Sequence, residues 1–138
     1  MNERPEYVPN ELLSRLVGLR LYSVQFVMDY LQLRFDGAND DTPVLSCDVM
    51  PTVETGTVRV APGDLGYAGA LVGLISHEVV GCSEATGSGL RIQFSSGTVI
   101  LHPTVDQLVG PEIALLGGFA DGQWMCWRPG EDSFEDLA

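Results

Sequence analysis

A pattern that occurs twice constrains the fold of this chain more than any other feature of its sequence. Residues 16–53 and residues 71–105 both begin with Leu-Val-Gly-Leu and continue with three apolar residues at alternate positions that end in Phe. Both then pass through a glycine-containing turn and finish with Pro-Thr-Val, and only the lengths of the linkers differ. We therefore predict that the chain contains two copies of one structural unit.

Within each copy, apolar and polar residues alternate, which is typical of an antiparallel strand with one buried face. Two matching inward rows are predicted, namely Leu31, Leu33 and Phe35 in the first copy and Leu90, Ile92 and Phe94 in the second. Just before the first row, a further alternating run is expected to be buried: Tyr22, Val24, Phe26 and Met28. Because small isolated sheets are marginally stable in water, we expect the rows of the two copies to pack against each other.

The remaining predicted elements are a short helix and a terminal hairpin. Asn10 is a suitable N-cap for a helix of about two turns whose leucines recur at helical spacing, and Gly18 ends it. Residues 64–70 contain two glycines, so any helix there is expected to be weak. Near the C-terminus, Ala-Asp-Gly at residues 120–122 is a turn signal inside a predicted hairpin at residues 112–128.

Together these signals predict a mainly β protein of about nine short strands in a single domain, residues 1–138. The strands form internally duplicated antiparallel meanders in a barrel or a sandwich, with one short N-terminal helix. The hairpin closes the barrel or covers an edge, and residues 129–138 form an acidic tail.

The charge balance restricts the partners of such a domain. Nineteen acidic residues stand against seven basic ones, which gives a net charge of −12. Such a surface repels nucleic-acid phosphates and acidic lipids, keeps a protein soluble and attracts a basic partner. We therefore expect neither nucleic acid nor membrane as a partner, and the charge favours a basic protein.

The cysteines and the N-terminus bear on the compartment. The sequence has no apolar run of membrane-spanning length and no signal-peptide pattern at its N-terminus. The cysteines Cys47, Cys82 and Cys126 are odd in number and far apart, which argues against disulfides and for a reducing compartment. We expect a cytoplasmic protein with buried thiols.

No motif for catalysis or cofactor binding is recognised. The two histidines, His77 and His102, do not form a zinc motif with Cys82 at any pairwise spacing. The chain has no lysine, which excludes a P-loop, and Gly-Ser-Gly at residues 87–89 is too short for a nucleophile elbow. Neighbouring glutamates, including Glu84, are expected to raise rather than lower the pKa of Cys82. No cofactor is predicted, and a non-enzymatic role is favoured over an enzymatic one.

Six residues are candidates for contact with a protein partner. Trp124 and Trp127 point to opposite faces of the predicted hairpin, so one of them is a candidate surface residue. In the alternative interpretation both belong to the core, where tryptophan is buried on average. Acidic pairs in a loop and in the tail complete the set: Asp40, Asp41, Glu131 and Asp132.

Two features resemble those of small actinobacterial proteins of unknown function. They are the repeated unit described above and the C-terminal segments Pro-Glu-Ile-Ala-Leu-Leu at residues 111–116 and Trp-Arg-Pro-Gly-Glu-Asp-Ser-Phe at residues 127–134. The resemblance covers nearly the whole chain and implies a cytoplasmic bacterial protein. Its motifs consist of apolar and turn residues, so it assigns no catalytic residue.

Three functions are compatible with these observations. The first is an acidic, non-enzymatic protein-binding module, such as an inhibitor, immunity or adaptor protein for a basic partner. The second is a β-barrel with a small-molecule cavity between the copies, with or without modest hydrolase or isomerase activity. The third is a homodimeric structural protein whose subunits pair through exposed strand edges.

Overall fold

The computed structural model describes residues 8, 10–37, 40–108 and 110–131. Its first half contains, in chain order, η1 (Leu13–Leu16), β1 (Arg20–Val27), β2 (Tyr30–Asp36), β3 (Val44–Cys47), β4 (Thr52–Thr55) and β5 (Val58–Val60). Its second half contains α1 (Tyr67–Val72), β6 (Val79–Ala85), β7 (Gly89–Phe94), β8 (Gly97–Leu101), η2 (Val105–Gln107), β9 (Ala114–Gly117) and β10 (Met125–Trp127). The elements η1 and η2 are 3-10 helices, and none of the helices in this part of the chain has the length and apolar character needed to cross a bilayer.

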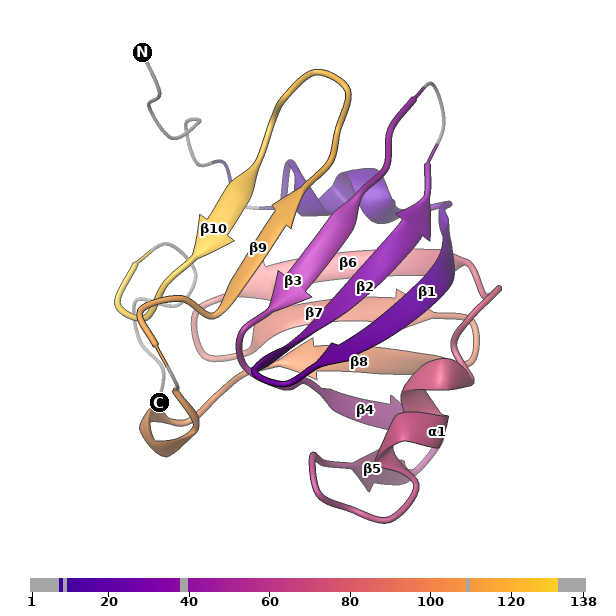
Figure 1. Cartoon of the computed structure of the whole chain (residues 1–138), viewed down its shortest axis with the longest axis vertical. Helices are drawn as coiled ribbons and strands as arrows, with labels where there is room; N and C mark the ends of the chain where they lie inside the picture. Colours follow the sequence, from indigo (N-terminus) through magenta and orange to yellow (C-terminus); the bar gives the residue numbers. More distant parts are fainter. Residues whose placement is uncertain (1–7, 9, 38–39, 109, 132–138) are drawn as a thin grey trace.

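The strands form two antiparallel five-stranded sheets. One sheet has the order β1-β2-β3-β9-β10, and the other has the order β5-β4-β8-β7-β6. In Figure 1 the sheets lie one in front of the other, and their strands run in different directions. The prediction of a mainly β protein is confirmed, and in the described part of the chain the architecture is sandwich-like rather than a closed barrel.

Each half of the chain supplies strands to both sheets. Three consecutive strands form a meander in each half, β1 to β3 in the first and β6 to β8 in the second. The hairpin that follows each meander crosses to the opposite sheet, because β4 pairs with β8 and β9 pairs with β3. The order of the strands is thus the same in both halves: a meander follows a helix and precedes an exchanged hairpin. The second half differs in having η2 between its meander and its hairpin.

The Pro-Thr-Val triplet, which ends each of the two predicted copies, has a different structure in the two halves. Pro-Thr-Val at residues 51–53 enters β4, whereas the same triplet at residues 103–105 leads into η2. The counterpart of the β4–β5 hairpin is the β9–β10 hairpin, which the sequence pattern places outside both copies at residues 112–128. A short triplet has no periodicity of its own, so its sequence does not fix its conformation.

The inward rows of the two meanders meet in the hydrophobic core between the sheets. All members of the two rows are buried there: Leu31, Leu33, Phe35, Leu90, Ile92 and Phe94. Residues 99–101 on β8 are also buried, as expected for the central strand of a sheet. The predicted packing of the two rows in one core is therefore confirmed.

The alternating run from Tyr22 to Met28 is an exception: its predicted burial is wrong for three of the four residues, whereas Val24 is half-buried and packs against the core. Tyr22, Phe26 and Met28 are 53%, 45% and 94% exposed. A β-bulge causes part of this difference, because the register steps between Leu21 and Ser23 and leaves Tyr22 as the extra residue. The strand β1 also lies at the edge of its sheet, so Phe26 has a neighbouring strand on one side only.

The helices also differ from the prediction. The helix η1 has only four residues, and Asn10 does not cap it: Asn10 adopts a φ of 67°, and its Oδ1 accepts the backbone N–H of Glu84 at 2.7 Å. The helix α1 forms in the region expected to be weak because Tyr67 and Leu71 are buried, and the Tyr67 hydroxyl donates to the carbonyl of Pro51 at 2.5 Å. Tertiary packing therefore outweighs the low helix propensity of glycine.

Candidate functional site

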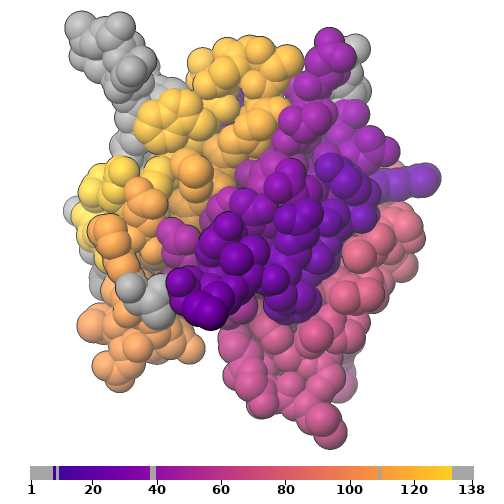
Figure 2. Space-filling view, viewed as in Figure 1, coloured from indigo at the N-terminus to yellow at the C-terminus, as the bar shows by residue number. Residues whose placement is uncertain are grey.

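A cleft of about 640 Å³ opens at one end of the sandwich. It lies where the β1–β2 turn, the segments after β3 and β5, and η2 come together. Figure 2 shows the molecule hollowed here, below the tip of the β1–β2 hairpin and between the orange segment around η2 and the magenta segment around β5. The described residues that line the cleft are Met28, Asp29, Asp48, Val49, Met50, Pro62, Asp106 and Gln107.

The lining combines carboxylates with flexible apolar side chains. Asp29, Asp48 and Asp106 supply the carboxylates, and none of the described lining residues is basic. Met28 and Met50 supply unbranched thioether side chains, which adapt to irregular ligand surfaces. Because Met28 is almost completely exposed, its side chain is available for contact.

Local structure holds two walls of the cleft in place. The backbone N–H of Asp48 donates to the carbonyl of Ile113 at 2.9 Å, which fixes the segment after β3 to the segment before β9. On another wall, η2 begins with a capping box in which the Gln107 side chain accepts the N–H of Thr104 at 2.8 Å. These walls are therefore anchored to residues that do not themselves line the cleft, Ile113 and Thr104.

One carboxylate of the cleft, that of Asp48, lies in surroundings that disfavour its negative charge. Burial raises the pKa of Asp48, and the nearby carboxylate of Glu112 raises it further. Glu112 pairs with Arg128 at 3.3 Å between Oε2 and Nη2, but this pair is partly exposed and contributes little. A cation that entered the cleft would stabilise the ionised form of Asp48.

The two halves of the chain differ at a pair of positions that borders the cleft. When the β4–β5 hairpin is aligned with the β9–β10 hairpin by strand pairing, Pro62 after β5 corresponds to Trp127 at the end of β10. Trp127 is fully buried, and its Nε1–H donates to Oε1 of Glu84 on β6 at 3.2 Å. The residue on β1 that corresponds to Glu84 is Phe26, which is 45% exposed. Pro62 thus lines the cleft at the position where the other half has a buried indole ring.

The residues predicted to contact a partner lie elsewhere. Trp127 is fully buried, so its ring is not accessible to a partner, and Trp124 is half-buried. Asp40 and Glu131 are exposed, and Asp132 lies outside the described residues. None of the predicted contact residues that the structure describes lines the cleft.

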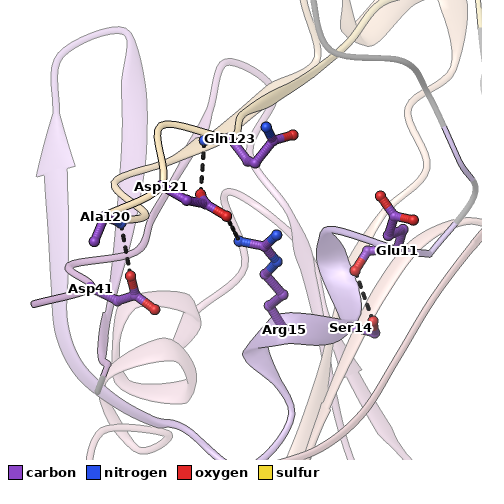
Figure 3. Close-up of polar contacts among 7 residues, drawn as sticks. All are labelled: Glu11, Ser14, Arg15, Asp41, Ala120, Asp121 and Gln123. Carbon is purple, nitrogen blue, oxygen red and sulfur yellow. Dashed lines mark hydrogen bonds and ion pairs between the residues drawn. The ribbon is translucent and has the colours of Figure 1, made fainter. Parts of the chain in front are cut away.

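Asp41, the remaining predicted contact residue, connects two loops. Its Oδ1 accepts the backbone N–H of Ala120 at 2.8 Å, which joins the β2–β3 loop to the β9–β10 loop (Figure 3). In the second loop, Asp121 accepts the N–H of Gln123 at 3.0 Å and pairs with Arg15 of η1 at 2.8 Å. The hydrogen bond from Gln123 and the contact with Arg15 lower the pKa of Asp121. These carboxylates therefore hold the loops and η1 together.

The thiols are not poised for nucleophilic chemistry. Burial raises the pKa of Cys82 to about 12, with a further contribution from Glu84, which confirms the predicted direction. Burial and Glu112 raise the pKa of Cys126 to about 11, and burial raises the pKa of Cys47 further still. Such thiols are not ionised near neutral pH and are weak nucleophiles. Among the residues that the structure describes, no group of three His, Cys, Asp or Glu side chains could hold a metal ion.

The sequence does not reveal the residues of the cleft. Asp29, Asp48 and Asp106 are far apart in the chain, and no motif relates them. The one local signal is Met28 beside Asp29, because a tight turn between two strands exposes an apolar side chain. The rest of the lining comes together only when the two sheets pack.

Comparison of the chain with protein-family models, with curated proteins and with solved structures found no match. The structure itself defines an acidic β-sandwich with hairpins exchanged between its sheets and a carboxylate-lined cleft at one end.

Proposed function

We propose that the protein is a non-enzymatic binding module that holds a basic segment of a protein partner in the acidic cleft. The observation that carries this proposal is the lining, which has three aspartates and two methionines and no basic residue among the described lining residues. A lysine or arginine of a partner supplies the absent cation, and its aliphatic stem suits the apolar part of the lining. Inhibitor, immunity and adaptor proteins that act on a basic partner belong to this class.

The charge of the whole chain supports the same class of ligand. A net charge of −12 attracts a basic partner over long distances and accelerates association at low ionic strength. At the cleft, a guanidinium group beside Asp48 offsets both the burial of this carboxylate and its repulsion by Glu112. Long-range attraction and local contact therefore favour the same occupant.

A small organic cation is the second candidate for the cleft. A volume of about 640 Å³ lies in the range of small-molecule sites. This candidate differs from a barrel with a cavity between the copies, because the hydrophobic core fills the described space between the two sheets.

The third candidate function is self-association through the edge strand β1. Tyr22, Phe26 and Val27 are exposed on this strand, and exposed apolar edge strands pair readily with a second chain. A twofold dimer through β1 is the simplest arrangement of this kind.

We also propose that the two halves are copies of one unit. Their strands follow the same order, and their first meander strands carry register shifts at matching places. The shift lies between Leu21 and Ser23 on β1 and between Val79 and Gly81 on β6.

Calorimetric titration of the full chain with a peptide of alternating arginine and leucine tests the binding proposal. We expect affinity that falls as salt rises from about 50 to 200 mM. The double variant Asp48→Asn with Asp106→Asn is expected to bind about tenfold more weakly, because two charged contacts are lost. A peptide of alternating glutamate and leucine is expected not to bind.

The matched control variant is Asp36→Asn with Asp40→Asn, which removes the same charge from exposed positions outside the cleft. Asparagine tolerates the positive φ of 70° at residue 40. If the control weakens binding as much as the cleft variant, the cleft is not the site. Arginine amide that binds as tightly as the peptide would instead support the small-cation candidate, and a dimer that disappears in Phe26→Glu would support self-association.

A further inference from the structure

A second pocket, of about 240 Å³, lies on the sheet that contains β5, β4, β8, β7 and β6. Its centre is a row of cross-strand neighbours, in which Ile100 on β8 is flanked by Thr52 on β4 and Arg91 on β7. Ile100 is almost completely buried, so it forms an apolar floor between a hydroxyl group and a guanidinium group. The rigid pairing of three strands fixes the spacing of these groups.

The rim of this pocket is basic, although the chain as a whole is strongly acidic. Arg59 on β5, Ser88 in the β6–β7 turn and His102 after β8 join Arg91 around the floor. The pocket thus contains two of the seven arginines and one of the two histidines of the chain. None of the described residues that line it is acidic.

Glu54, next to the pocket, holds both guanidinium groups. Its Oε2 lies 2.8 Å from Nη2 of Arg59, and its Oε1 lies 3.4 Å from Nη2 of Arg91. One carboxylate offsets only one of the two positive charges, so the pair keeps a positive excess. A guanidinium has five N–H donors, and the contact with Glu54 engages a single nitrogen of Arg91. The other donors of Arg91 remain for a ligand.

We infer that this pocket binds a small phosphate monoester. Guanidinium groups bind phosphate oxygens with charge-assisted hydrogen bonds, and the hydroxyl group of Thr52 adds a neutral donor. The pocket is larger than a phosphate group alone, so the alcohol part of the ester lies over the apolar floor at Ile100. Large polyanions do not fit this assignment, because a chain with a charge of −12 repels them.

Titration of the ¹⁵N-labelled full chain, followed by NMR, tests this inference with three probes: inorganic phosphate, glucose 6-phosphate and glucose. We expect glucose 6-phosphate to shift the amide signals of residues 88, 91 and 102, at concentrations several-fold lower than inorganic phosphate requires. Glucose alone is expected to cause no shift. If glucose shifts the same signals, the pocket does not recognise an anion, and if inorganic phosphate binds as tightly as the ester, the assignment to a monoester is wrong.

Two variants with effects of opposite sign separate binding from folding. Arg91→Gln is expected to weaken glucose 6-phosphate about tenfold, whereas Glu54→Gln is expected to strengthen it, because it removes the competing carboxylate. Arg20→Gln, which removes the same charge at an exposed position on β1, is the control and is expected to bind like the original chain. Unchanged binding in both Arg91→Gln and Glu54→Gln would overturn the inference, even if both variants fold normally. The cleft variant with Asp48→Asn and Asp106→Asn is expected to retain phosphate binding, so the two sites are tested independently.

Discussion

Phe35 and Phe94 stack on each other in the core, with ring centroids 6.5 Å apart and ring planes inclined by only 6°. The two rings hold corresponding positions, because each ends the inward row of its meander. The two halves of the chain therefore meet at equivalent side chains, one from each sheet. The same correspondence appears in the backbone, where Arg20 and Glu78, just before the two register shifts, form an antiparallel bridge.

The stacked pair is expected to be coupled energetically. Phe35→Leu and Phe94→Leu should each lower the free energy of unfolding by about 1–2 kcal/mol, because each leaves a small cavity. The double variant should lose about 0.5–1.5 kcal/mol less than the sum, since either single change already abolishes the stacking. Urea unfolding measures the free energy of unfolding of the two single variants and of the double variant. Phe26→Leu, at a 45% exposed position on the edge strand β1, is the control. If Phe26→Leu lowers the free energy of unfolding as much as the core variants do, burial in the core does not explain their effect.

The hydrogen bond between Trp127 and Glu84 is expected to stabilise the contact between edge strands of the two sheets. Trp127→Phe keeps an aromatic ring but removes the N–H donor to a buried carboxylate. This change should lower the free energy of unfolding, measured in urea, by about 1–3 kcal/mol. Trp124→Phe is the matched control at a half-buried position. If Trp127→Phe lowers the free energy of unfolding less than Trp124→Phe does, the hydrogen bond to Glu84 does not stabilise the fold in this way.

Asp48 is expected to make the protein less stable as the pH rises. Its pKa is higher in the folded state than in the unfolded chain, so the folded state holds the proton more tightly. The resulting stabilisation is complete below the unfolded pKa and is lost as the pH rises through the raised folded pKa. Asp48→Asn should therefore gain stability relative to the original chain between acidic and neutral pH, by less than about 1 kcal/mol because the group is partly exposed. Asp40→Asn is the control, and an equal gain there would contradict the assignment to burial and Glu112.

Met28 permits a test of the cleft that does not disturb the fold, because its side chain is almost fully exposed. Met28→Lys places a positive charge at the mouth and should weaken the arginine–leucine peptide about threefold to tenfold. Met28→Glu should strengthen it by a similar factor, and both variants should unfold at the same urea concentration as the original chain. If the two changes move the affinity in the same direction, charge does not govern binding at this site.

The alternation of apolar and polar residues predicts the buried rows of the two meanders correctly. The rows that end in Phe35 and Phe94 alternate strictly, and both are buried as expected. The run from Tyr22 to Met28 also alternates up to Phe26, but a bulge exposes Tyr22 and an edge position exposes Phe26, and neither is visible in the polarity of the residues. The helix α1 depends on tertiary contacts of Tyr67 that local propensity does not include.

The sequence could not predict the cleft for a related reason. Its walls come from four segments whose proximity depends on which hairpin joins which sheet, and alternation does not specify that choice. The difference between Pro62 and Trp127 has meaning only after the two hairpins are known to correspond. Residue type alone also does not show that Trp127 is buried in the core or that Asp41 joins two loops.

The crossing hairpins have a consequence for how the molecule can be divided. A cut between β5 and α1 would give two fragments, each with a three-stranded meander and a hairpin that has no meander of its own to pair with. Neither fragment contains a complete sheet, so we expect both to be largely unfolded alone and to recover the native fold only when mixed. The chain is in this sense an intramolecular counterpart of a strand-swapped dimer, in which each half completes the other.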